Sequence, residues 1–118
     1  MKEEKFKIIQ YIRELIINID NNLENFPKKD IELKNRLRSN SYDILEVVYK
    51  ANTIKDKSKK LDLLYDLIAK LKVIDFLINI CYDKQIINSK RYIKFGEKID
   101  DISKFVAGWM NSIAKEQS

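Results

Sequence analysis

Apolar residues recur every three or four positions along four stretches of this chain. The first stretch covers residues 3–25. Its apolar residues, together with the one that follows it, are Ile9, Ile12, Ile16, Ile19, Leu23 and Phe26. This spacing places side chains on one face of an α-helix. Ile8 and Leu15 widen the stripe, which favours the core of a helix bundle over the narrow seam of a two-stranded coiled coil.

The second and fourth stretches repeat this pattern. In residues 31–52 the seam is Leu37, Ile44, Val48 and Ala51, with Ser41 at one seam position and Leu33 and Leu45 beside it. In residues 89–114 the seam is Tyr92, Ile99, Ile102, Val106, Trp109 and Ile113. Both stretches are therefore predicted to be amphipathic helices that turn one face toward a common core.

The third stretch, residues 57–83, is apolar over a wider arc. Two stripes overlap in it, one through Leu64, Ile68, Leu71 and Ile78 and the other through Leu67, Leu71, Ile74, Leu77 and Cys81. A helix of this kind is either central to a bundle or covered by another subunit. The sequence leaves both alternatives open.

Polar residues mark the helix boundaries. The only proline, Pro27, is expected to end the first helix, because the residue before a proline is disfavoured in the helical conformation. Asp30 and Asp56 are expected to cap the second and third helices with their carboxylates. Gly96 and Gly108 lie inside the fourth helix, where each indicates either a close backbone approach or a tolerated glycine.

Four helices over residues 3–25, 31–52, 57–83 and 89–114, joined by short connections, predict an all-α protein. We expect a single domain over residues 1–118, folded as an antiparallel up-down-up-down four-helix bundle. Two glycines and one proline are too few for the many turns of a β-sandwich or barrel.

The composition excludes several kinds of chemistry. Histidine is absent, which removes the usual general base, the Ser-His-Asp and Cys-His sites and the commonest metal ligand. The single cysteine, Cys81, lies on an apolar stripe and is expected to be a buried thiol. We therefore expect no catalytic residue, cofactor or metal. A charged N-terminus and the absence of an apolar run of about 18 residues favour a cytoplasmic protein without a membrane partner.

Positive charge is the feature that indicates a partner. The net charge is +5, and the predicted topology brings the first and third connections to the same end of the bundle. The cations there, called the first basic end, outnumber Asp30, Glu32 and Glu97. They are the candidate nucleic-acid-binding residues: Lys28, Lys29, Lys34, Arg36, Arg38, Lys84, Lys90, Arg91, Lys94 and Lys98.

Within the first basic end, two rows have helical spacing. Lys34 and Arg38 are four residues apart, and Arg91, Lys94 and Lys98 follow at intervals of three and four. Such rows can track the phosphates of RNA or DNA, and Tyr92 among them is either a core residue or a platform on which a base stacks. No base-reading motif is present, so binding through the backbone is expected.

Two alternatives to this interpretation stay open. The patch can be a solvated, lysine-rich surface. The opposite end is also basic, since only Asp56 offsets Lys50, Lys55, Lys57, Lys59 and Lys60 there. Charge alone does not decide which end binds nucleic acid.

Several short motifs, taken in order, resemble one family. They are Phe26-Pro27-Lys28, Asn35-Arg36-Leu37-Arg38, Ala51-Asn52, a leucine-rich third helix running into Asp83, Tyr92, and Gly108-Trp109. Together they resemble the Avd (accessory variability determinant) proteins. The relatives of this group include four-helix proteins encoded in intervening sequences of large-subunit ribosomal RNA genes.

The resemblance implies a homopentameric barrel of four-helix bundles. It also implies a non-catalytic protein that binds RNA or DNA and partners the reverse transcriptase of a diversity-generating retroelement in mutagenic cDNA synthesis. The alternative is a ribosomal intervening-sequence protein, an oligomer with a structural or protein-interaction role. This chain is richer in lysine and poorer in arginine than the better-known Avd proteins, and arginine is the better bidentate phosphate ligand.

Overall fold

The structure, a computed structural model, describes residues 2–24 and 26–117. It contains α1 (Lys2–Asn21), the short 3₁₀ helix η1 (Lys28–Asp30), α2 (Ile31–Thr53), α3 (Lys57–Asp83) and α4 (Ser89–Gln117). No strand occurs among the described residues. The prediction of an all-α chain with four long helices is confirmed.

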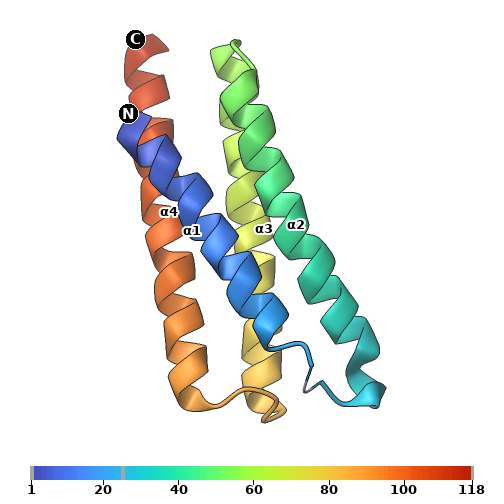
Figure 1. Cartoon of the computed structure of the whole chain (residues 1–118). Coiled ribbons are helices and arrows are strands. Elements are labelled where there is room, and N and C mark those ends of the chain that lie inside the picture. The colour runs from blue at the N-terminus through green and yellow to red at the C-terminus, as the bar shows by residue number, and fades with distance from the viewer. Residues whose placement is uncertain (1, 25, 118) are drawn as a thin grey trace.

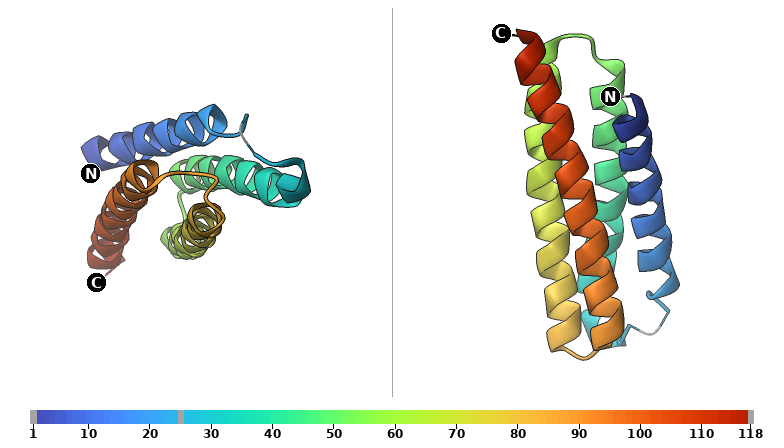
Figure 2. Two further views of the ribbon diagram at one scale, coloured as in Figure 1. Left: turned by 90° about the horizontal axis from the view of Figure 1, so that it is seen from below. Right: turned by 90° about the vertical axis from the view of Figure 1, so that its left-hand side faces the viewer.

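The helices alternate in direction along an elongated body of 50 × 23 × 18 Å (Figure 1). The α1–α2 and α3–α4 connections lie together at one end. The α2–α3 connection lies at the other, beside the first and last helical turns of the chain, as the right-hand view of Figure 2 also shows. This is the up-down-up-down topology expected for short connections between antiparallel helices.

Each long helix packs against two others. The packed pairs are α1 with α2, α2 with α3, α3 with α4 and α4 with α1, whereas α1 and α3, and likewise α2 and α4, do not pack together within the described chain. Helix α3 is therefore one of the four corner helices. The residues of its two apolar stripes are buried within the bundle except Ile68, which is half-buried, whereas Tyr65 and Phe76 lie outside both stripes and are 62% and 61% exposed.

The core lies where the predicted seams meet. Ile12, Ile44, Ile74 and Ile102 contribute to it from the four helices, and each has no accessible surface. The core of α1 is centred on Ile8 and Leu15, which the sequence placed at the edge of the stripe, while Ile9 is only half-buried. Apolar residues spaced three and four apart leave more than one possible centre for the buried face of a helix. The packing of α1 against its neighbours decides which residues form that centre.

The first helix ends earlier than expected. Helix α1 stops at Asn21 and not at residue 25, which lies outside the described residues. Pro27 immediately precedes η1 and has an extended conformation (φ −61°, ψ 146°). The side chain of Asn22 donates to the carbonyl of Asn18 at 2.6 Å. An asparagine side chain that bonds to the backbone competes with regular helical hydrogen bonds. The contact between Asn22 and Asn18 therefore ends α1, and the prediction that Pro27 ends this helix was wrong.

The two predicted caps differ. Asp56 caps α3 as expected, because its Oδ1 accepts a hydrogen bond from the backbone N–H of Lys59 at 3.1 Å. Asp30 precedes α2 but makes no capping hydrogen bond. Its side chain is instead 8% exposed and paired with Lys84. Asn88 supplies a cap that sequence reasoning missed, with its Oδ1 accepting from the N–H of Arg91 at 2.9 Å.

Helix α4 runs three residues beyond the predicted end, to Gln117. The apolar seam stops at Ile113, but Ala, Lys, Glu and Gln are strong helix formers and extend the helix into solvent. A methyl group built on Gly96 would meet no atom within 4 Å, so this glycine is tolerated and marks no close approach. No helix in the described part of the chain combines the length and apolar character needed to cross a bilayer.

Candidate nucleic-acid interface

The first basic end is held together by an ion pair between its two connections. The Nζ atom of Lys84, after the last residue of α3, lies 3.0 Å from Oδ1 of Asp30 in η1. Helix α4 is tied to the end of α1 in a similar way, because the guanidinium of Arg91 donates to the side-chain oxygen of Asn22. The topology thus brings the first and third connections together, as the sequence predicted.

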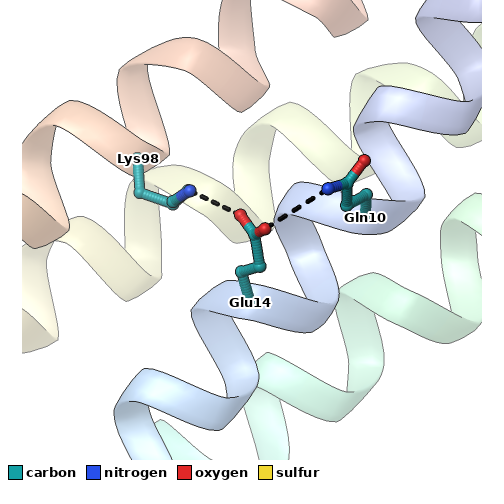
Figure 3. A network of polar contacts seen from close by, with 3 residues as sticks. All are labelled: Gln10, Glu14 and Lys98. Atoms are coloured by element: carbon teal, nitrogen blue, oxygen red, sulfur yellow. Dashed lines mark hydrogen bonds and ion pairs between the residues drawn. The ribbon is translucent and has the colours of Figure 1, made fainter.

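Lys98 has a structural role. Its Nζ atom lies 2.6 Å from Oε2 of Glu14 on α1 (Figure 3). The same atom lies 4.4 Å from the centroid of the Tyr11 ring. Gln10 donates to the other carboxylate oxygen of Glu14 at 3.4 Å. The hydrogen bond from Lys98 lowers the pKa of Glu14 below its ordinary value of 4.5. The ammonium groups of Lys84 and Lys98 are therefore both paired within the protein, Lys84 with Asp30 and Lys98 with Glu14.

The other cations of this end are available to a partner. Within the described chain, no carboxylate lies within ion-pair distance of the following residues: Lys28, Lys29, Lys34, Arg36, Arg38, Lys90, Arg91 and Lys94. All of these are exposed except Lys34, which is half-buried. Surface lysines and arginines without a carboxylate partner attract phosphates and release counterions when they bind, although Arg91 also donates to Asn22.

The two rows of cations do not lie on neighbouring helices. Lys34 and Arg38 belong to α2, and Arg91 and Lys94 belong to α4, the diagonal helix with which α2 makes no contact. The two rows, which the sequence placed on two helix faces, therefore form two separate basic surfaces at one end. Each surface has its own neighbours, and each can be tested by itself.

The α4 surface contains a groove that sequence reasoning missed. Arg91 and Lys94 line it with Phe95, with Asn18 and Asn21 of α1 and with Asn22 just after this helix, around a volume of about 360 Å³. Amide and guanidinium groups there can donate hydrogen bonds to phosphate and sugar oxygens. The signal that could have located the groove is the cluster of asparagines at the end of α1, which lies opposite the first turns of α4.

Tyr92 is engaged within the protein. Its ring stacks on that of Tyr82 with a centroid distance of 4.3 Å and an interplanar angle of 6°, and its hydroxyl donates to the side-chain oxygen of Asn79. The side chain is half-buried between α3 and α4. Of the two predicted roles, packing is therefore the one observed, and Tyr82 occupies one face of this ring.

The acidic side chains and the thiol bear on two kinds of chemistry, a metal site and a reactive nucleophile. No group of three or more His, Cys, Asp or Glu side chains comes together among them. Cys81 is 1% exposed, as the sequence predicted, and burial, followed by the negative charge of Asp30, raises the pKa of its thiol to about 11. A thiol with this pKa is a weak nucleophile near neutral pH.

Comparison with known proteins identifies the family. Neither a curated protein sequence nor a solved structure matches the chain. A family model described as bAvd-like matches residues 5–113, which include all of α2 and α3, most of α1 and α4, and both basic surfaces. The chain therefore belongs to the bAvd-like family.

Proposed function

We propose that this protein is a non-catalytic, homo-oligomeric accessory protein that binds RNA or DNA through the backbone. We further propose that it partners the reverse transcriptase of a diversity-generating retroelement in mutagenic cDNA synthesis. The observation that carries the proposal is membership of the bAvd-like family over residues 5–113. The unpaired cations of the first basic end support it, because exposed cations without carboxylate partners provide the sequence-independent part of nucleic-acid affinity.

Template RNA titrated at several salt concentrations tests the nucleic-acid role. We expect the logarithm of the binding constant to fall linearly with the logarithm of salt concentration, with a slope near −0.7 per phosphate contact for a single strand. Affinity that is indifferent to salt, or no binding at low salt, would contradict the proposal.

Charge reversal then identifies the surface. Lys34→Glu with Arg38→Glu reverses the charge of the α2 row. Arg91→Glu with Lys94→Glu reverses the charge of the two cations that line the α4 groove. The matched control is Arg13→Glu with Lys104→Glu, which makes the same change in net charge at two exposed positions outside the first basic end and outside the α2 and α3 faces. We expect each site variant to weaken binding by at least tenfold more than the control while the helical circular dichroism is kept.

The outer face of α3 supports the homo-oligomer. Tyr65, Val73 and Phe76 follow helical spacing there and are 62%, 41% and 61% exposed. Asp62, Asp66 and Asp83 lie on the same side of the helix, and Lys72 lies one turn before Phe76 on the stripe itself. An apolar stripe with an acidic border is typical of a contact surface and is costly to leave in water.

A second copy of the chain offers a complementary surface. Tyr42, Leu45 and Tyr49 of α2 line an open apolar groove of about 590 Å³, and Arg38 lies one turn before Tyr42 on the same side. We propose that the acidic-bordered α3 stripe of one copy packs on the α2 groove of the next. Contacts between two different faces close into a ring when the rotation allows, and the pentamer implied by the family resemblance is such a ring.

Light scattering after size exclusion tests the assembly. We expect a pentamer for the wild type and monomers for Phe76→Glu and for Tyr49→Glu, which change the two opposite faces of one contact. Ile93→Glu is the matched control, because Ile93 is similarly exposed (57%) but lies on α4 away from both faces. A wild-type monomer at micromolar concentration would contradict the assembly.

The same apolar stripe favours a second candidate function. An oligomer with a structural or protein-interaction role, as in the ribosomal intervening-sequence relatives, would need the α3 contact but no nucleic acid. A pentamer that binds neither RNA nor DNA at low salt would support this second function over the first.

A further inference from the structure

Lysines also converge on a small cavity at the opposite end of the bundle. Lys5 reaches it from the first turns of α1, Lys55 from the α2–α3 connection, and Lys57 and Lys60 from the start of α3. Trp109 and Ser112 of α4 line its other side. These elements come together at the end that carries both termini in Figure 1. Sequence reasoning identified the lysines of the connection but not Lys5, which is far from them along the chain.

The positive charge of this cavity is poorly compensated. Glu116 is the one acidic residue among those that line it, and its carboxylate lies 3.3 Å from Nζ of Lys57. Lys5 is held 5.2 Å from the centroid of the Trp109 ring, where it has no carboxylate partner in the described chain. The half-buried Lys60 has a lowered pKa because of burial first and then of the positive charge of Lys5, which Glu116 partly offsets.

The size of the cavity limits what it can hold. Its volume is about 80 Å³, several times the roughly 10–15 Å³ that one water molecule requires on the same measure. It is also far below the roughly 300–1,000 Å³ of a site for a drug-sized ligand. Ammonium groups and the Ser112 hydroxyl are donors that suit tetrahedral oxyanions, and bringing lysines together becomes favourable once an anion lies between them.

We propose that Lys5, Lys57, Lys60 and Ser112 form a binding site for a single phosphate group, to which Lys55 adds positive charge. The phosphate is either free inorganic phosphate or the terminal phosphate of a nucleic acid strand, since both present the same oxyanion. This site lies at the end opposite the first basic end. It does not depend on nucleic-acid binding there.

Trp109 provides the readout, because it is the only tryptophan in the chain and it lines the cavity. We expect inorganic phosphate, added at constant ionic strength against sodium chloride, to change the fluorescence of Trp109 along a saturable curve. We also expect phosphate to raise the melting temperature relative to chloride, since a ligand that binds only the folded state stabilises it. A linear response equal to that of chloride would overturn the proposal.

Neutral substitutions locate the site. Lys60→Gln and Lys5→Gln are expected to weaken phosphate binding by at least tenfold each. The matched control pair, Lys28→Gln and Lys29→Gln at the first basic end, is expected to leave it unchanged. Circular dichroism and the melting temperature in chloride report folding separately, and Lys60→Gln should not lower that temperature, because it removes a charge from a repulsive cluster. Equal phosphate affinity in the wild type and Lys60→Gln would exclude the assigned residues.

Oligonucleotides distinguish the two sources of phosphate. If a short RNA with a 5′-phosphate changes Trp109 fluorescence at concentrations at least tenfold lower than the same RNA with a 5′-hydroxyl, the ligand is a strand terminus. If inorganic phosphate binds and the two RNAs behave alike, the ligand is the free ion. The proposal is wrong if neither inorganic phosphate nor the 5′-phosphate gives a specific response. The charge-reversal variants of the first basic end test the proposed function separately.

Discussion

The ammonium group of Lys84 lies 3.0 Å from Oδ1 of Asp30, and the two residues differ sharply in exposure. The Lys84 side chain is 47% exposed, whereas that of Asp30 is 8% exposed. Within the described chain, the second carboxylate oxygen of Asp30 is buried without a hydrogen-bond partner. This one pair joins the connection before α2 to the connection after α3, so it holds the first basic end together.

Removing the two partners should therefore have unequal effects. Lys84→Gln leaves a buried carboxylate without its cation, and we expect it to lower the free energy of unfolding by about 1–3 kcal/mol. Asp30→Asn should cost less, because Lys84 returns to water. Urea denaturation of both variants at pH 7 measures the difference. A larger loss for Asp30→Asn would show that the carboxylate stabilises the fold by some other contact.

The pair between Glu14 and Lys98 makes stability depend on pH. The pKa of Glu14 is lowered in the folded state, so its contribution is fully present above 4.5 and is lost as the pH falls through the lowered value. Because Glu14 is 41% exposed, we expect Glu14→Gln to lower the free energy of unfolding at pH 7 by less than about 1 kcal/mol.

Denaturation curves of the wild type and Glu14→Gln between pH 7 and pH 2 test this expectation. The difference in unfolding free energy should shrink below pH 4.5 and become smaller in 1 M salt, which screens exposed charges. A difference that is constant with pH would mean that packing by the Glu14 side chain, and not its charge, stabilises the contact.

Gln85 carries the only positive φ among the described residues, 63°. It follows the end of α3 in a turn in which the N–H of Ile86 bonds to the carbonyl of Cys81 and the N–H of Gln85 bonds to that of Tyr82. Glycine is the usual residue at this position. The left-handed conformation costs residues other than glycine roughly 1–2 kcal/mol. A glycine avoids this cost, but it loses more conformational entropy on folding, which offsets part of the gain.

We therefore expect Gln85→Gly to raise the free energy of unfolding by about 0.5–1 kcal/mol. Gln85→Ala, which keeps the unfavourable conformation, is the matched control and should give no gain. Thermal denaturation of the three proteins measures the order. Equal stability of the glycine and alanine variants would be inconsistent with strain at this turn.

Cys81 should react slowly in the folded protein. With a thiol pKa of about 11 in place of the ordinary 9.0, the thiolate population at pH 8 falls by roughly 100-fold. We expect alkylation of the folded protein at pH 8 to be slower than that of the urea-unfolded chain by at least this factor. Fast alkylation of the folded protein would mean that α3 opens readily near its end.

Asp30 should contribute to this slow reaction. Its charge raises the pKa of Cys81 after the larger effect of burial, so Asp30→Asn should shift the pH profile of alkylation toward lower pH. Lys84→Gln keeps the negative charge and is the control. An identical profile for Asp30→Asn and the wild type would assign the raised pKa to burial alone.

The hydrophobic pattern determined most of the fold. The seams through Ile12, Ile44, Ile74 and Ile102 predicted the helices and the faces that became the core, because the period of a helix is a local property of the chain. Short connections then left the up-down-up-down bundle as the favoured topology. The cap at Asp56 could also be predicted from the sequence, since a capping hydrogen bond involves only residues of its own helix.

The tertiary structure decided which charged groups meet, because that depends on contacts between segments distant in sequence. Asp30 has the residue type and position of a cap, yet Lys84 from the other connection takes its carboxylate. Lys34 and Arg91 appeared to belong to one patch, yet the packing order puts α2 and α4 on a diagonal. Lys5 meets Lys57 and Lys60 around one cavity only because the bundle places the first turns of α1 at the same end as the start of α3. The sequence by itself thus determined the bundle and its basic character, while packing alone decided which cations hold the fold and which are left for a partner.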